Sequence, residues 1–217
     1  GPRLTGTAGE HAAAKYIAEQ FRSFGLKTKF QEFDVDTFDC DAHELKVKIN
    51  GKWKEIPIQP IGLSGSTPVK GMTGELYDAE YGQPEYFSPE MEGKIVLICG
   101  RVHPQNRYKF LRYKPKAVVF IESHLTEEPM RVNLREESLE AYGHIPLGRI
   151  THLDGLEIVK HGATKAKLIM RNTSHKSHCK NVIGEVKGTD HPDEIITICG
   201  HYDTSRDISG ASDNAGG

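Results

Sequence analysis

The fold is decided by the stretch Ile195-Ile196-Thr197-Ile198-Cys199-Gly200-His201-Tyr202-Asp203-Thr204, which Gly210-Ala211-Ser212-Asp213-Asn214-Ala215-Gly216 follows closely. The apolar run 195–198 is typical of a strand that is covered on both faces. In open α/β sheets, ligands bind outside the carboxyl ends of such strands, and His201 comes just beyond this one. We therefore expect an α/β domain with a functional site at this end of the strand.

The residue types after this strand suit a metal site. His201 can offer a neutral imidazole nitrogen to a metal, and Asp203 can accept a hydrogen bond from the other ring nitrogen, which fixes the tautomer. Asp213 adds a carboxylate that can bridge two cations about 3.5–4 Å apart. A lone His-x-Asp is common, and Asp-Asn-Ala-Gly-Gly alone predicts a turn. Their occurrence together after a buried type of strand favours the metal site.

These residues resemble the signature of the co-catalytic zinc aminopeptidases and their carboxypeptidase relatives. Two other regions agree with it. Arg3-Leu4-Thr5-Gly6-Thr7 and the helix after it are similar to the family's entry motif, and Asn181-Val182-Ile183-Gly184 is similar to the strand before its metal strand. The block between these regions resembles a protease-associated domain, inserted as in glutamate carboxypeptidase and transferrin receptor.

The resemblance implies an α/β fold class with a partial phosphorylase/hydrolase-like zinc peptidase domain, built on a mixed sheet with helices. A β-rich protease-associated domain interrupts it. We expect the peptidase domain at residues 1–37 and 174–217, and the inserted domain at residues 38–173.

The same resemblance implies roles for three residues. His201 and Asp213 would be metal ligands, with Asp213 bridging two zinc ions, and Asp203 would be the catalytic-site residue that orients His201. The peptide bond from Asp213 to Asn214 would be cis. The family's Glu-Glu pair, its further acidic ligand and its last His have no match here, so the zinc ligand set is incomplete. We therefore expect this chain to be an excised segment of a longer protein and to lack peptidase activity alone.

The function implied is that of a zinc-dependent exopeptidase, of which this chain is the N-terminal part. An aminopeptidase is favoured, with a peptide substrate whose N-terminal bond is hydrolysed through a water that bridges two zincs. The alternative is a non-catalytic binding or assembly module on the same fold, as in transferrin receptor. The intact His201, Asp203 and Asp213 argue against that alternative, and zinc binding would separate the two.

Bulk properties exclude several other classes. The chain has 217 residues, a formal net charge of −2 and a mean hydropathy of −0.51, which are typical of a globular domain. Acidic and basic residues are interspersed, which argues against nucleic acid as a partner. The longest apolar runs are strand-sized, far below the roughly 20 residues that a membrane span needs.

The cysteines and one histidine-rich segment give weaker signals. Four widely spaced cysteines predict free thiols, and Cys99 and Cys199 are expected to be buried because each ends an apolar run. His175-Lys176-Ser177-His178-Cys179 offers three further metal-binding side chains. No second cluster matches their spacing, so we expect a polar loop there.

Local patterns predict one long helix and a series of short strands. The helix runs between Thr7 and Gly25, with a capping box formed by Thr7 and Glu10. Its expected apolar face consists of Ala13, Tyr16, Ile17, Phe21 and Phe24. Strands are expected at residues 26–35, 45–49, 74–77, 94–99, 117–121, 145–150, 166–170, 181–186 and 194–199.

Three of these elements carry specific expectations. Asn50-Gly51 predicts a hairpin turn. Pro146 predicts that the strand around it lies at a sheet edge. Thr151 and Asp154 predict the start of a short helix that ends at His161. The strands 181–186 and 194–199 are expected to form an antiparallel hairpin.

Overall fold

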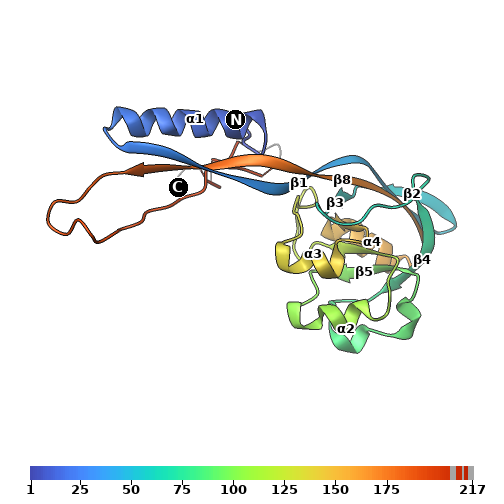
Figure 1. Cartoon of the computed structure of the whole chain (residues 1–217). Helices are drawn as coiled ribbons and strands as arrows, with labels where there is room; N and C mark the ends of the chain where they lie inside the picture. The colour runs from blue at the N-terminus through green and yellow to red at the C-terminus, as the bar shows by residue number, and fades with distance from the viewer. Residues whose placement is uncertain (206–208, 212, 215–217) are drawn as a thin grey trace. The chain divides into compact units, whose positions relative to one another are not determined.

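The computed structural model describes residues 1–205, 209–211, 213 and 214. The chain forms two compact units. The terminal unit comprises residues 1–37 and 175–217, and the middle unit comprises residues 38–174. Two long strands, β1 (Lys27–Ile49) and β8 (Lys165–Glu185), contribute residues to both units, as the blue and orange ribbons of Figure 1 show.

The sheet has eight strands in the order β2-β1-β8-β4-β5-β6-β7-β3. The shorter strands are β2 (Lys52–Ile56), β3 (Gln59–Pro60), β4 (Met72–Asp78), β5 (Ile95–Cys99), β6 (Ala117–Ile121) and β7 (Leu147–Ile150). The neighbours β4, β5, β6 and β7 pair in parallel, whereas β1 with β2, β4 with β8 and β3 with β7 are antiparallel. The sheet is therefore mixed, as expected.

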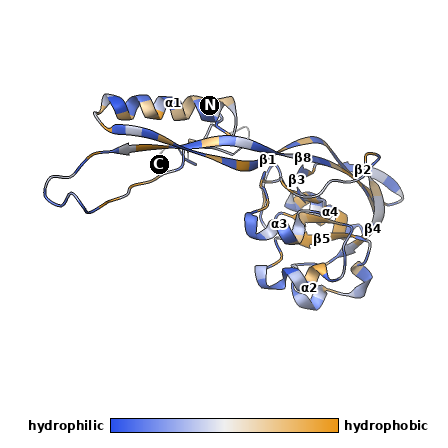
Figure 2. Ribbon diagram, in the orientation of Figure 1, coloured by the Kyte–Doolittle hydropathy of each residue, from blue (hydrophilic) through white to orange (hydrophobic). Residues whose placement is uncertain are grey.

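The core of the middle unit lies on both faces of β5 and β6. Ile95 and Leu97 of β5 belong to one buried cluster, and Val96 and Ile98 belong to the other. Successive side chains of a strand point to opposite faces, so this alternation places apolar residues on both sides. Figure 2 shows the hydrophobic colouring of β5, in agreement with a strand that is covered on both faces.

Helices cover both faces of this sheet. α4 (His152–Lys160) adds Ile158 to the first cluster, whereas α2 (Arg107–Leu111) and α3 (Glu136–Tyr142) add Phe110 and Tyr142 to the second. Gly155 of α4 lies so close to β6 that a Cβ atom there would meet Ile121 Cγ2 at 2.2 Å. Three turns of 3-10 helix complete the unit: η1 (Pro84–Tyr86), η2 (Pro89–Met91) and η3 (Pro104–Asn106).

The middle unit is rich in strands and carries three short α-helices, which agrees with the expected β-rich inserted domain. The middle unit has parallel strands with helices on two faces, and the assignment to a protease-associated domain stays a prediction. The expected edge strand is corrected, because β7 lies between β6 and β3 and Pro146 precedes it. A proline just outside the strand removes no ladder hydrogen bond from it.

The predicted hairpin and the predicted short helix are confirmed. Asn50 and Gly51 have φ values of 48° and 77°, and they join β1 to β2 with Ile49 opposite Lys52. Positive φ at both central residues matches the twist of hairpin strands. Thr151 caps α4, because its side chain accepts a hydrogen bond from the Asp154 amide. In contrast, the two strands expected at 26–35 and 45–49 are one continuous strand, β1.

Helix α1 (Ala8–Ser23) begins where the sequence predicts, but the face that it buries only partly matches the expected one. Its buried residues are Glu10, Ala14 and Ala18, while Tyr16 of the expected apolar face is 62% exposed. The capping box is absent, because the Thr7 hydroxyl donates to the Leu4 carbonyl oxygen. No helix among the described residues is long and apolar enough to cross a membrane.

The expected strand 194–199 is not formed. Its residues have no strand assignment, and Ile195, Ile196 and Ile198 are each about nine-tenths exposed. The hairpin with residues 181–186 is therefore wrong, and those residues belong to β8 instead. All four cysteines are free, and Cys199 is exposed whereas Cys179 is buried. An apolar run alone cannot form a strand without a neighbour to pair with.

A buried ion pair lies just beyond β6. The Glu122 carboxylate is fully buried and accepts from Arg149 Nε at 2.8 Å and Arg149 Nη2 at 2.5 Å. The Met130 amide donates a further hydrogen bond to it, at 2.9 Å. Burial alone would raise the pKa of Glu122, but the hydrogen bonds from Arg149 and Met130 outweigh burial and hold the pKa below its usual range.

We expect Glu122→Gln to lower the free energy of unfolding by about 3 kcal/mol at pH 7, because it leaves the guanidinium of Arg149 without its counter-charge. A lowered pKa in the folded state contributes stability above the unfolded-state value of about 4.3. That contribution is lost as the pH falls through the folded-state pKa. Urea denaturation at pH 7 and at pH 3 should therefore show a difference between the two proteins that shrinks on acidification.

Glu157→Gln is the matched control, because the Glu157 carboxylate pairs with Lys54 at the surface, at 2.6 Å. Exposed pairs contribute little, so this variant should change stability by less than about 1 kcal/mol. Equal losses in the two variants would contradict a special contribution of the buried pair.

Candidate metal centre

Within the terminal unit, His201 lies between two carboxylates. Its Nδ1 is 2.9 Å from Asp203 Oδ1, and its Nε2 is 2.9 Å from Asp213 Oδ1. The hydrogen bond with Asp203, with the charges of both carboxylates, raises the pKa of the imidazole. The structure therefore brings together the three residues that the sequence singled out.

Asp203 is itself held by the N-terminal segment. Thr5 Oγ1 donates to Asp203 Oδ2 at 3.0 Å, while Asp203 Oδ1 faces the imidazole. Each carboxylate oxygen thus has its own partner, which restricts rotation of the carboxylate about its Cβ–Cγ bond. A carboxylate fixed in this way holds the tautomer and orientation of the histidine.

Arg3 extends this connection along the backbone. Its amide donates to Thr204 Oγ1 at 2.8 Å, and its carbonyl oxygen accepts from the Thr204 amide at 3.1 Å. Its guanidinium donates to the carbonyl oxygens of Tyr202 at 2.7 Å and Ser209 at 3.0 Å. These bonds hold residues 202–204 and 209 to the start of the chain.

The turn that carries Asp213 is fitted closely to Arg3 and Thr204. Gly210 has a φ of 70°, and a Cβ atom there would meet Thr204 Cγ2 at 2.3 Å. Only glycine combines that backbone conformation with that space. The bond between Asp213 and Asn214 is cis, as expected, and Asn214 Nδ2 donates to the His201 carbonyl oxygen at 3.1 Å.

A buried acid of α1 anchors the residue between the two site residues. Glu10 is 2% exposed, and one of its carboxylate oxygens accepts a short hydrogen bond from the Tyr202 hydroxyl. The same hydroxyl lies 2.5 Å from the Lys180 carbonyl oxygen. Burial, and then the bond with Glu10, raise the pKa of Tyr202, so the phenol keeps its proton at neutral pH.

The donor set fits part of a zinc site. Two ligands at about 2.0–2.1 Å from one zinc, at a tetrahedral angle, lie roughly 3.3 Å apart. His201 Nε2 and Asp213 Oδ1 are 2.9 Å apart, which is close to that spacing. Within the described part of the chain, no group of three or more His, Cys, Asp or Glu side chains is arranged to hold a metal ion together. The residues present therefore supply about half of a zinc ligand set.

The histidine-rich segment lies on β8 and not in a loop. His178 Nδ1 is 3.0 Å from Asp34 Oδ1 and its Nε2 is 3.5 Å from Glu32 Oε2, and the bond with Asp34 raises the pKa of the imidazole. Neighbouring Lys176 pairs with Asp36 at 2.8 Å. These side chains form an exposed network of ion pairs across β1 and β8.

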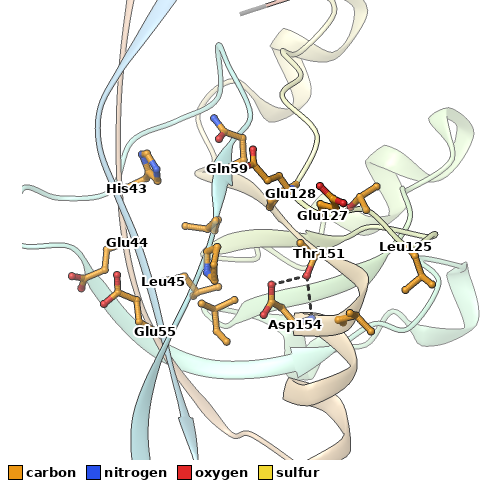
Figure 3. A pocket seen from close by; sticks show the side chains of 16 residues that line it. His43, Glu44, Leu45, Glu55, Gln59, Leu125, Glu127, Glu128, Thr151 and Asp154 are labelled. Atoms are coloured by element: carbon orange, nitrogen blue, oxygen red, sulfur yellow. Dashed lines mark hydrogen bonds between the residues drawn. The ribbon is translucent and has the colours of Figure 1, made fainter. Parts of the chain in front are cut away.

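The middle unit contains a pocket of about 940 Å³ with acidic walls. Figure 3 shows Glu44 and Glu55 on one side of it and Glu127 and Glu128 on the other. Two of its carboxylates already have partners within the protein. Glu44 forms an ion pair with Lys46 at 2.9 Å, and Asp154 accepts a hydrogen bond from the Thr151 hydroxyl at 2.6 Å. The pocket contains none of the three site residues predicted from the sequence.

Comparison with known proteins shows a similarity to zinc aminopeptidases and their relatives. The sequence profile of peptidase family M28 matches residues 181–217. Aminopeptidase YwaD from Bacillus subtilis (strain 168) is 30% identical over 223 residues, which cover 100% of this chain and 46% of that protein. The chain is therefore similar to the M28 peptidases over residues 181–217 and to this aminopeptidase along its whole length.

Other relatives extend the comparison. Carboxypeptidase Q from Homo sapiens is 22% identical over 236 residues, which cover 100% of this chain and 49% of that protein. The chain thus spans about half the length of the curated relatives it matches. A solved zinc aminopeptidase from Bacillus subtilis has a TM-score of 0.66 and 27% identity, covering 88% of this chain and 44% of that one. An aminopeptidase from Aneurinibacillus sp. strain AM-1, with a TM-score of 0.66 and 20% identity over 90% of this chain and 47% of its own, supports the mixed α/β fold.

Sequence analysis missed the residues that support the site. Arg3 and Thr5 stood out only as part of a motif, and Glu10 was assigned to a helix cap. The available signal was the position of Arg3-Leu4-Thr5-Gly6-Thr7 just before the first helix. The motif gave no indication that Thr5 contacts Asp203, 198 residues further along the chain.

We expect Tyr202→Phe to lower the free energy of unfolding by about 1.5–3 kcal/mol, because it leaves a buried oxygen of Glu10 without its donor. Urea denaturation monitored by circular dichroism would measure this loss. Tyr16→Phe is the matched control, since Tyr16 is exposed on α1, the helix that carries Glu10. It should leave the free energy of unfolding unchanged within about 0.5 kcal/mol. Equal stability of the two variants would contradict an anchoring role for the Glu10–Tyr202 bond.

Proposed function

We propose that this chain is the N-terminal part of a zinc-dependent exopeptidase, to which it contributes the ligands His201 and Asp213 and the orienting carboxylate Asp203. The observation that carries the proposal is the convergence of His201 Nε2 and Asp213 Oδ1 at 2.9 Å, with Asp203 on the other ring nitrogen. The similarity to the M28 peptidases supports it.

Each residue has a defined part in this proposal. The zinc, when bound, would polarise the scissile carbonyl and make water a stronger nucleophile. His201 would ligate it through Nε2, and Asp203 would keep the proton on Nδ1 by accepting its hydrogen bond. Asp213 would share its carboxylate between two metal positions, and Thr5 would hold Asp203 in place through its second oxygen.

An aminopeptidase acting on peptides is favoured over a carboxypeptidase. Aminopeptidase YwaD is 30% identical to this chain, whereas carboxypeptidase Q is 22% identical. The groups that select the substrate terminus are expected outside these 217 residues. A non-catalytic binding or assembly module remains the alternative outcome, and it would not require an intact set of His201, Asp203 and Asp213.

We expect the longer protein that contains this chain to retain about two zinc ions per molecule after dialysis. Asp213→Ala should retain one or none, because the shared carboxylate is lost. Mass spectrometry of the metal content would measure this ratio. His191→Ala is the control, since His191 is exposed and pairs only with Glu194 among the described residues. Retention of two zinc ions by Asp213→Ala would overturn the ligand assignment.

Thr5→Val tests the orienting bond without removing a ligand. Loss of a group that positions a metal ligand typically weakens metal affinity by 10- to 100-fold. We therefore expect zinc affinity about tenfold lower in Thr5→Val than in Thr5→Ser, which keeps the hydroxyl. Competition with a fluorescent zinc chelator would measure it, and equal affinities would show that the Thr5 bond does not act on the site.

We expect the purified 217-residue chain to release no product from aminoacyl-nitroanilides, because the resemblance places the general base in the unmatched part of the family site. The longer protein should hydrolyse the same substrates. Hydrolysis by the 217-residue chain that Asp213→Ala abolishes would contradict this expectation. An inactive longer protein that binds no zinc would favour the binding-module alternative.

A further inference from the structure

A second pocket in the middle unit is lined by basic side chains. It has a volume of about 200 Å³ and lies against the sheet, where the loop after β5, the start of α2, the segment before α3 and β7 meet. Its cationic residues are Arg101, Arg107, Arg135 and Arg149. None of the residues described as lining this pocket is acidic. Its wall is therefore strongly positive.

Most of this positive charge is not neutralised by the protein. Arg149 pairs with the buried carboxylate of Glu122, at 2.5 Å. Arg107 Nη1 donates to the carbonyl oxygen of Glu137 at 3.4 Å, a contact that leaves its charge uncompensated. Across the described residues, Arg101, Arg107 and Arg135 have no carboxylate within ion-pairing distance. Like charges around one small pocket repel each other, so a bound anion would relieve that repulsion.

A buried hydroxyl at the same pocket lacks a partner. Tyr142 of α3 is 5% exposed, and its hydroxyl makes no hydrogen bond to any described residue. Buried polar groups in native proteins almost always have a partner. Burial raises the pKa of Tyr142 to about 12, against a smaller opposing effect of the nearby Arg107 charge. The hydroxyl therefore keeps its proton at neutral pH and is an unsatisfied hydrogen-bond donor.

The floor of the pocket is apolar. Val102, Phe120 and Leu147 line it and are buried. Its volume of about 200 Å³ suits a small molecule or one terminal group of a larger one. A ligand that fits would combine an acceptor-rich anion with an apolar part.

We propose that this pocket binds the oxyanion, either a carboxylate or a phosphate, of a small molecule that also carries an apolar group. Arg101, Arg107 and Arg135 supply the charge, and guanidinium groups match both kinds of oxyanion through paired N–H donors. Tyr142 supplies a neutral donor from the wall. The site lies among residues 61–149 and is independent of the proposed zinc chemistry.

Titration calorimetry on the purified protein tests this with four probes: phenylacetate, its neutral isostere phenylacetamide, phenyl phosphate and inorganic phosphate. We expect at least one of the two aromatic anions to bind at least tenfold more tightly than phenylacetamide. Tighter binding of phenylacetate identifies a carboxylate ligand, and tighter binding of phenyl phosphate identifies a phosphate ligand. Inorganic phosphate should bind more weakly than phenyl phosphate, because it leaves the apolar floor uncovered.

Variants locate the binding. Arg101→Gln and Arg107→Gln should each weaken binding of the anion by about tenfold, the usual effect of losing one charged hydrogen bond. Lys109→Gln is the matched control, because it removes one positive charge from α2 outside the pocket lining and should leave affinity unchanged. Tyr142→Phe should weaken binding about threefold without lowering the Tm of the free protein, since the hydroxyl it removes has no partner.

Two results would overturn the proposal. One is equal affinity for phenylacetate, phenyl phosphate and phenylacetamide, or no binding of any of them, because the pocket would then not recognise charge. The other is anion binding that Lys109→Gln weakens as much as Arg101→Gln does, because the anion would then respond only to net charge. Arg101 is exposed and makes no hydrogen bond within the described residues, so its variant is expected to fold even if Arg107→Gln does not.

Discussion

The candidate metal centre depends on the hydrogen bonds between residues 3–5 and residues 202–204. The run before His201 is not paired as a strand, so no sheet ladder fixes the segment that follows it. The N-terminal segment supplies the missing constraint: Arg3 binds the backbone on both sides of Asp203, and Thr5 binds its carboxylate. Glu10 adds a buried anchor through Tyr202. Because these bonds join the two ends of the chain, the site is built from residues that are nearly 200 positions apart.

The middle unit obeys a different constraint, which is the burial of β5 and β6 on both faces. Side-chain alternation along each strand feeds two apolar clusters, and α4 covers one while α2 and α3 cover the other. Charged groups are left to the margins of this sheet. There one acid, Glu122, is paired with Arg149, while the three remaining arginines of the small pocket stay without counter-charge.

Short-range patterns predicted several elements well. The Asn50-Gly51 turn, the cap of α4 and the strands β5 and β6 all follow from the conformations that a few consecutive residues prefer. The sequence predictions were wrong where residues distant along the chain determine the local structure. The apolar run 194–199 lacks a paired strand. Helix α1 buries an acid and two alanines, and that acid is bound by the hydroxyl of Tyr202 from a distant part of the chain. The parallel order of β4 to β7 depends on which strands meet, and strand periodicity is the same in parallel and antiparallel sheets.

The sequence by itself determined which metal-binding side chains are present: a histidine with two aspartates at a spacing that suits metal ligands. It also determined the resemblance to zinc peptidases, which the comparisons support. It determined these things because residue type and local spacing are properties of the chain. Only the tertiary structure decided which groups position those side chains. The hydrogen bonds of Thr5 with Asp203 and of Glu10 with Tyr202 join distant segments, and the pocket that Tyr142 shares with the arginines is also built from distant segments. No local pattern specifies these arrangements. The energies of these interactions depend on how deeply the groups are buried and how close their charges lie, and both are set only when the chain folds.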